Sequence, residues 1–350
     1  MEKLADRSRL EGKGAGRRKA LAPDAELLSR EIEAAHSLSR RTFLAATFAL
    51  AAPVLRYVPA RAGAPSALSV SEVAPGVFVH QGLYEEQSPQ NRGDIANASF
   101  IVGKDAVAVI DTSGSFKVGR ELHAAIRGVT DRPIKYVINT HMHPDHVLGN
   151  AAFKADRPDY VGHHKLQRAL AMRADSYLQS NKLMLGDEAF EGSEIVLPTV
   201  LVEDKLSLDL GGRSLVCEPQ KTAHTDNDLI ITDTATDTLF LGDLLFSVHI
   251  PTIDGSIKGW LSLLDELATR KAARVVPGHG PPAMEFPGAL DAERKYLSTV
   301  ASDVRKLIAD NKTMSEAAKT AALSERADWK LFDTFHVRNV TTAFAELEWD

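Results

Sequence analysis

Short apolar runs separated by polar turns dominate the chain after residue 70 and predict an alternation of strands and helices. The run 106–110 is almost continuously apolar, which is typical of a strand buried on both faces. Ser113, Gly114 and Ser115 follow it and predict the cap of a helix. That helix would place apolar residues on one face, at Val118, Leu122, Ile126 and Val129. This order of elements indicates an α/β fold.

The same patterns predict the other elements. Strands are expected at 77–80, 98–102, 136–139, 160–162, 206–210, 214–217, 229–231, 238–241 and 274–276. Helices are expected at 166–184, 260–267 and 297–308. The helix at 166–184 could cover a site as a lid. The polar stretch 84–95 contains Pro89 and Gly93 and predicts a mobile loop.

The N-terminus carries the pattern of an export signal. Residues 39–44 read Ser-Arg-Arg-Thr-Phe-Leu and lead into the apolar run 43–55. That run is too short to span a bilayer well, so a membrane anchor is the weaker interpretation. Small residues at Ala60 and Ala62 predict cleavage after Ala62. We therefore expect a periplasmic protein, exported by the twin-arginine route and not inserted in a membrane after cleavage.

These limits divide the chain into an N-terminal extension with its signal, 1–62, and one mature domain, 63–350, whose part 288–350 is helical. A translation start at Leu38 stays open. Residues 1–62 hold 12 Lys+Arg and 7 Asp+Glu, so 63–350 carry 29 and 40, a formal charge of −11. An acidic protein repels phosphate backbones, which excludes nucleic acid as a substrate. The single cysteine, Cys217, excludes an intramolecular disulfide.

Three histidines and one aspartate lie within six positions, directly after an expected apolar strand. His141 and His143 alternate by two, so an extended backbone points both to the same side. Asp145 and His146 follow the turn set by Pro144 and can face a second ion nearby. Imidazole and carboxylate are typical zinc ligands, and two adjacent sets of them indicate a two-metal site rather than solvated surface histidines.

The remaining candidate ligands come later in the chain. Asp111, Asp243 and His279 each follow an apolar run, which is where α/β sheets place their ligands. His224 instead comes just before an apolar run. Glycines beside Asp243 and His279 let the backbone turn tightly there.

Together these motifs resemble the metallo-β-lactamase superfamily over roughly residues 70–282: Asp111, His-x-His-x-Asp-His at 141–146, His224, Asp243 and His279. Three longer stretches, 91–97, 146–153 and 254–260, are similar to a SoxH-related branch, the quinoprotein relay system zinc metallohydrolases. The resemblance implies an αββα sandwich, in which two mixed sheets face each other, helices lie outside, and the metals sit at one edge.

The resemblance also implies a ligand set. One metal would take His141, His143 and His224; the other would take Asp145, His146 and His279; Asp243 would bridge both. Asp111 would hold the histidine loop without binding metal. A plain strand-ending aspartate is the alternative for Asp111. Two zinc ions are expected, and iron or manganese stay open as alternatives.

The expected reaction is hydrolysis by a hydroxide that bridges the two zinc ions, with Asp145 as the catalytic carboxylate that orients it and moves its proton. Asp243 at the bridging position resembles glyoxalase II and lactonases, which indicates a small acyl substrate: an ester, thioester or lactone. Residues 223–227 are instead reminiscent of class B1 enzymes, so a class B-like β-lactamase is an alternative. A non-catalytic accessory or carrier protein of a quinoprotein dehydrogenase system is another alternative.

Four further histidines are candidates for substrate contact, although structural hydrogen bonding is the commoner role: His163, His164, His249 and His336. Trp260 and Cys217 are expected in the core.

Overall fold

Two mixed sheets form the centre of the fold in the computed structural model, which describes residues 66–350. The predictions for residues 1–62 lie outside the described residues. The first sheet has the order β1 (Ser71–Ala74), β2 (Val77–His80), β3 (Ala98–Val102), β4 (Val107–Ile110), β5 (Ile134–Ile138), β6 (Asp159–His163), β7 (Val200–Val202). The second has the order β12 (Arg274–His279), β11 (Thr238–Phe246), β10 (Leu229–Asp233), β9 (Ser214–Pro219), β8 (Leu206–Asp209).

The two sheets pack face to face through one apolar core. Side chains alternate along each strand, so β10 turns Leu229 and Ile231 toward the first sheet while Ile230 faces the other way. Cys217 on β9 belongs to this inter-sheet core and is fully buried, as predicted. In the first sheet β4 to β7 are parallel, and in the second sheet β11 and β12 are parallel.

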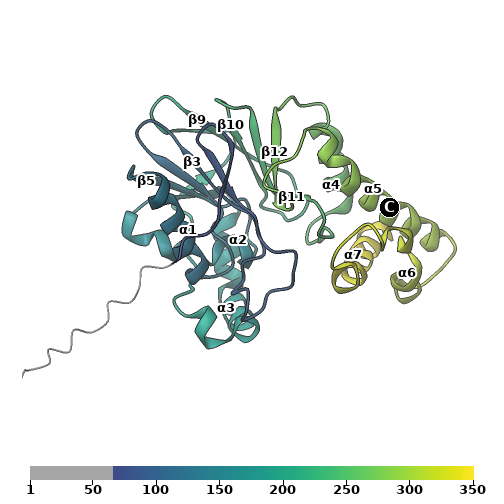
Figure 1. The fold of residues 1–350 in the computed structure, drawn as a ribbon. Helices are drawn as coiled ribbons and strands as arrows, with labels where there is room; N and C mark the ends of the chain where they lie inside the picture. The colour runs from purple at the N-terminus through teal and green to yellow at the C-terminus, as the bar shows by residue number, and fades with distance from the viewer. Residues whose placement is uncertain (1–65) are drawn as a thin grey trace, which may run out of the picture. The chain divides into compact units, whose positions relative to one another are not determined.

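Helices cover the outer faces of both sheets (Figure 1). On the first sheet lie α1 (Phe116–Val129) and α3 (Leu166–Phe190), with the short α2 (Pro144–Val147) at the strand ends. On the second sheet lies α4 (Ile257–Leu267), with α5 (Asp291–Ala309) packed beside it. The helices α6 (Met314–Thr320) and α7 (Phe332–Leu347) pack with α5 on the side away from the sheet. Short 3₁₀ turns span Asn150–Asp156, Gly288–Leu290 and Leu323–Glu325. The predicted αββα sandwich with a helical C-terminal part is confirmed.

The helix α1 illustrates how far the apolar pattern predicts packing. Ser115 caps it, because the Ser115 side chain accepts a hydrogen bond from the Val118 N–H. Leu122 and Ile126 are fully buried against the first sheet. The prediction that Val129 lies on the same buried face is wrong. The helix ends at Val129 and leaves its side chain 43% exposed.

Two boundaries differ from the sequence predictions in ways that matter for function. The strand predicted at 238–241 continues to Phe246, because parallel pairing with β12 resumes after an irregularity at Gly242. Asp243 therefore lies inside β11 and not after it. The helix predicted at 166–184 continues as α3 to Phe190, across a break at Gly186, whose φ of 76° is not helical. Within residues 66–350, no helix is long and apolar enough to cross a membrane.

Candidate metal centre

All seven predicted ligand residues meet at one edge of the two sheets. The first set holds His141, His143, His224 and Asp243, and the second holds Asp145, His146 and His279. In each set the possible ligand atoms lie within 4.8 Å of one another. The β5–α2 connection, α2, β11 and the last residue of β12 supply six of these groups, and the loop before β10 supplies His224.

Asp243 stands between the two sets and presents a different oxygen to each. Its Oδ2 lies 3.6 Å from Nε2 of His141 and 3.4 Å from Nε2 of His224. Its Oδ1 lies 3.1 Å from Nε2 of His146 and 3.5 Å from Nε2 of His279. A carboxylate in this position would be able to ligate an ion in each set.

Every ligand histidine is oriented through its other ring nitrogen. The Nδ1 of His146 bonds Asp111, that of His224 bonds the Thr252 carbonyl, and that of His279 bonds the Ile95 carbonyl. The Nδ1 of His141 bonds the Thr140 hydroxyl, whereas His143 uses Nε2 to bond Asp254. Such partners fix the ring and its tautomer, so Nδ1 of His143 and Nε2 of the other four rings are left to face the metal positions.

Unpaired buried atoms test whether the cluster suits metal ions. Nε2 of His141, Nε2 of His146 and Oδ1 of Asp243 are buried and make no hydrogen bond. Buried polar atoms without a partner are rare and costly in proteins. Because all three point into the cluster, and because imidazole and carboxylate are zinc donors, the residues fit two metal ions.

The two sets differ electrostatically before a metal ion binds. Burial lowers the pKa of His141 well below its usual value and lowers that of His224 to about 3, so both rings are neutral donors. In the second set, burial acts in the same direction, but the carboxylates of Asp243 and Asp145 prevail and raise the pKa of His279 to about 9. At His146, burial also lowers the pKa, but the charges of Asp243 and Asp111 outweigh this effect and raise the pKa above its usual value. A metal ion in the second set must therefore displace protons.

Asp111 belongs to neither set and bonds the histidine loop. Its Oδ1 accepts the Thr140 N–H at 2.8 Å, and its Oδ2 accepts the Thr140 hydroxyl at 2.7 Å and Nδ1 of His146 at 2.8 Å. Asp111 and Ser113 both have positive φ, 56° and 69°. Non-glycine residues rarely adopt this conformation, and such strain concentrates at functional sites.

A family model of the metallo-beta-lactamase superfamily matches residues 91–279, more than half of the chain. The chain belongs to the metallo-beta-lactamase superfamily. The match covers all seven residues of the two sets.

Individual relatives agree with this superfamily fold. The linear primary-alkylsulfatase of Pseudomonas sp. is 26% identical over 221 residues, which cover 52% of this chain and 41% of that protein. The chain thus spans about two fifths of the length of this curated relative. A metallo-beta-lactamase from Pontibacter korlensis has a TM-score of 0.54 at 20% identity, covering 66% of this chain and 99% of that one. A double mutant of the sec-alkyl sulfatase PisA1 has a TM-score of 0.56 at 17% identity, covering 72% and 45%.

A cleft of about 340 Å³ lies at the edge of the two sheets where the two ligand sets meet, which we call the metal edge. The metal sets line its floor with His143, Asp145, Asp243 and His279. The walls come from three other places: Glu86, Gln87 and Ile95 of the loop predicted at 84–95, Met184 of α3, and Phe335 and Arg338 of α7. The lid predicted at 166–184 thus contributes one side chain to the cleft. Sequence motifs gave no indication of Phe335 or Arg338, because neither belongs to a recognisable pattern.

Of the four further candidate histidines, only His249 lines this cleft. Its ring lies against that of His279, with centroids 5.0 Å apart. Burial and the neighbouring His279 lower the pKa of His249 to about 4, so its ring is neutral at pH 7. His163 and His164 stack on each other elsewhere, and His336 is buried among the C-terminal helices. Trp260 is fully buried beside His224, as predicted for a core residue.

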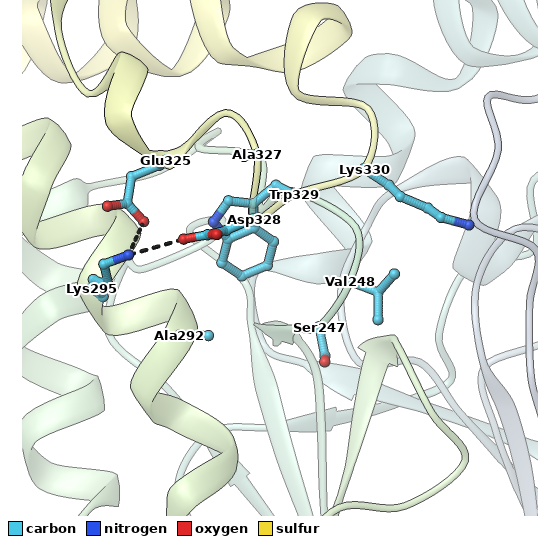
Figure 2. Close-up of a pocket in the computed structure, with 9 residues that line it drawn as sticks. All are labelled: Ser247, Val248, Ala292, Lys295, Glu325, Ala327, Asp328, Trp329 and Lys330. Atoms are coloured by element: carbon cyan, nitrogen blue, oxygen red, sulfur yellow. Dashed lines mark hydrogen bonds and ion pairs between the residues drawn. The ribbon is translucent and has the colours of Figure 1, made fainter.

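A second cavity, of about 420 Å³, lies between α5 and the segment before α7 (Figure 2). Three of its charged side chains are paired with one another, because Nζ of Lys295 lies 3.1 Å from Glu325 and 3.0 Å from Asp328. None of the seven candidate metal ligands lines it. Four of these seven residues line the cleft at the metal edge instead.

Proposed function

We propose that the chain is an exported dinuclear zinc hydrolase that cleaves an ester, thioester or lactone. The observation that carries this proposal is the position of Asp243. One of its oxygens lies 3.6 Å from Nε2 of His141 and the other 3.1 Å from Nε2 of His146. A single carboxylate can therefore ligate two ions at once, as in two-metal hydrolases.

Bound zinc ions would supply a Lewis acid and, from water, a nucleophile at neutral pH. The chain's own residues would position the reaction around them. Asp145 faces the cleft, and its Oδ2 lies 3.3 Å from Nε2 of His279, so it can orient an attacking water and take up its proton. Phe246 stacks on His279 at 4.9 Å and, with Ile95, limits the access of other water molecules.

Cleavage of a sulfate ester is a second candidate. The curated relative is named a linear primary-alkylsulfatase, and a sec-alkyl sulfatase shares the fold. The apolar wall formed by Ile95, Met184 and Phe335 would suit an alkyl chain as well as an acyl chain. β-Lactam hydrolysis is a third candidate, favoured by the residues around His224 and by the metallo-beta-lactamase from Pontibacter korlensis that shares the fold.

Export by the twin-arginine route, a periplasmic location and a link to a quinoprotein dehydrogenase system are further parts of this proposal. They rest on Arg40 and Arg41, on the small residues before position 63, and on the similarity of 91–97, 146–153 and 254–260 to quinoprotein-linked hydrolases. Replacing Arg40 and Arg41 together by Lys should hold the precursor in the cytoplasm. Normal periplasmic accumulation of this variant would contradict the route.

A substrate screen on zinc-loaded protein tests the reaction class. We expect about two zinc ions per chain by elemental analysis, and turnover of esters, thioesters or lactones that exceeds that of β-lactams and alkyl sulfates. Asp243→Asn should lose most of this turnover, whereas Asp226→Asn, an exposed aspartate near His224, should keep it. Faster cleavage of an alkyl sulfate or a β-lactam would select the corresponding alternative. Full zinc loading without any turnover would favour an accessory role.

A further inference from the structure

We propose that Arg338 binds a carboxylate that the substrate carries away from its scissile bond. The inference rests on the proposed hydrolase function, because it assigns the substrate class of the same cleft. It concerns α7, which lies beyond the residues 91–279 matched by the family model. The substrate would then be an acyl compound with an apolar middle part, one end at the metal centre and an anionic group at the other end.

The helix α7 is firmly attached to the loop that precedes α4, so Arg338 has a fixed origin. The next residue, Asn339, is fully buried; its Nδ2 donates to the Pro251 carbonyl at 2.7 Å and its Oδ1 accepts the Ile253 N–H at 2.9 Å. Further along α7, the Glu346 carboxylate accepts the Ile257 N–H at 2.8 Å. A side chain on such a rigid element can give specificity at low entropic cost.

Arg338 reaches from this helix toward the metal centre. One of its Nη atoms donates to Oδ1 of Asp254 at 2.9 Å, and Oδ2 of Asp254 lies 3.0 Å from Nε2 of His143. The guanidinium has five N–H donors in a planar fork, and its side chain is 56% exposed, so donors remain for a ligand in the cleft. Asp254 thus contacts both the guanidinium of Arg338 and the candidate metal ligand His143, and it orients the guanidinium beside the metal centre.

The charges around the cleft favour one carboxylate as the bound group. In the part of the chain that the structure describes, Arg338 is the only Arg or Lys among the residues that line the cleft. Glu86 lines the same cleft and accepts a hydrogen bond from the Thr334 hydroxyl at 2.9 Å. Its negative charge would oppose a doubly charged phosphate more than a singly charged carboxylate. A carboxylate also matches the fork of an arginine in a bidentate contact.

The apolar residues of the cleft indicate which middle part the ligand should have. Phe335 lies one turn before Arg338 on α7, and residues three apart share a helix face. Met184 and Phe246 also line the cleft. Between the metal centre and Arg338 the cleft therefore offers an apolar surface, which suits a short methylene chain between two polar ends.

Binding of small carboxylates by calorimetry tests this assignment without any turnover. Butyrate offers one carboxylate, whereas the dicarboxylates from succinate to adipate can place one end at the metal centre and the other at Arg338. For zinc-loaded full-length protein we expect at least one dicarboxylate to bind about tenfold more tightly than butyrate, the value of one charge-assisted hydrogen bond. Arg338→Gln should abolish this preference, and Arg338→Lys should keep part of it.

Two matched variants separate recognition from support of the metal site. Arg326→Gln removes an arginine that pairs with Asp333 on the surface of the same C-terminal part, and it should leave the preference unchanged. Asp254→Asn changes the partner of both His143 and Arg338, so it should weaken zinc binding and lower the dicarboxylate preference together. If Arg338→Gln lowers the zinc content, or weakens the binding of butyrate and dicarboxylates equally, or if the wild type shows no dicarboxylate preference, the assignment is wrong.

Kinetics then distinguish failure of this inference from failure of the proposed function. The pair 4-nitrophenyl butyrate and the 4-nitrophenyl half-ester of glutarate differs mainly by one carboxylate. Arg338→Gln should lower kcat/KM for the half-ester about tenfold, mostly through KM, and change that of the butyrate ester less than about twofold. A protein that prefers dicarboxylates through Arg338 but cleaves no ester would overturn the proposed reaction and keep this binding site. Equal losses on both esters would overturn the role of Arg338.

Discussion

Buried histidines occur in both the sandwich and the C-terminal helices, but they differ in whether their ring nitrogens are hydrogen-bonded. In the sandwich, Nε2 of His141 and Nε2 of His146 are buried, make no hydrogen bond and lie 3.6 Å and 3.1 Å from the Asp243 carboxylate. In the C-terminal part, His336 has both ring nitrogens bonded, to the Tyr296 hydroxyl at 3.0 Å and to the Ala321 carbonyl at 2.9 Å. Burial alone therefore does not identify a functional histidine, but an unpaired buried nitrogen beside a carboxylate does.

The contrast is local to the metal centre and to the surroundings of His336. At the metal centre, Asp111 has positive φ, Oδ1 of Asp243 makes no hydrogen bond, and the pKa of His279 is raised. Around His336 the helices form a closed network in which Asn339 and Tyr296 are also bonded to each other. We infer that the sandwich supplies the chemistry and the helices supply a rigid wall for the cleft. Each prediction below separates these two contributions.

The largest effect is expected from the bridging carboxylate of the sandwich. Asp243→Asn removes a charge that faces both ligand sets, so kcat should fall roughly 10²-fold, as on loss of one strong electrostatic element. The zinc content should also fall below that of the wild type, measured by elemental analysis. Circular dichroism should show the fold retained, because Asn has nearly the same shape. A variant with unchanged kcat would contradict the bridging role.

The pH dependence of zinc binding should reflect the second ligand set. Nearby carboxylates outweigh the effect of burial and raise the pKa of His279 to about 9, so below that pH a metal ion must displace its proton. Affinity should therefore fall as the pH is lowered from 9 to 6, by about tenfold per pH unit for each displaced proton. Calorimetry in buffers of different ionisation enthalpy measures the protons released. Zinc affinity that does not change across this range would be inconsistent with a protonated His279.

Much of the sandwich could be predicted from sequence because its signals are local. The strand at 98–102 was predicted with its observed bounds, since a short apolar run between turns has few other solutions. The ligand residues were predicted because a compact His-x-His-x-Asp-His motif is dense in metal donors, and the resemblance to a known superfamily placed the distant Asp243 and His279 beside it. The extension of β11 past Asp243 was missed, because it depends on pairing with β12 far along the chain.

The cleft walls could not be predicted in the same way. Phe335 and Arg338 lie on α7, where a helical pattern specifies a buried face but not which element the helix packs against. Their position depends on contacts such as that of Asn339 with Ile253, which are 86 residues apart in sequence. Nothing local in the chain encodes such a contact. Substrate recognition was therefore the part of the function that sequence patterns left open.

A pair of glycine substitutions compares the packing of the two regions directly. A Cβ at Gly278 would lie 2.0 Å from Oδ1 of Asp243, whereas a Cβ at Gly288, beside the C-terminal helices, would meet nothing within 4 Å. Gly278→Ala should therefore lower the free energy of unfolding by about 1–3 kcal/mol and displace the bridging carboxylate, with loss of zinc. Gly288→Ala should change the free energy of unfolding by less than about 1 kcal/mol. Denaturant unfolding and zinc analysis of both variants check this, and equal effects would mean that the metal edge is no more tightly packed than the helical part.

The smallest effect is expected from loosening α7 while the metal centre stays intact. Asn339→Ala removes the partners of the Ile253 N–H and the Pro251 carbonyl. Unpaired buried groups of this kind cost about 1–3 kcal/mol, so denaturant unfolding should show a stability loss in this range. Because α7 positions Arg338 and Phe335, KM should rise a few-fold, whereas kcat and zinc content should stay close to wild type.

Val337→Ala is the matched control for this last variant, because Val337 lies on the same helix with 53% of its surface exposed. It should change neither the stability nor KM appreciably. If Asn339→Ala instead lowers the zinc content as strongly as a change at Asp243, α7 supports the ligands themselves. The inference that the sandwich supplies the chemistry and the helices supply only the cleft wall would then be wrong. The hydrogen bonds of Asp254 to His143 and to Arg338 would connect α7 to the metal ligands.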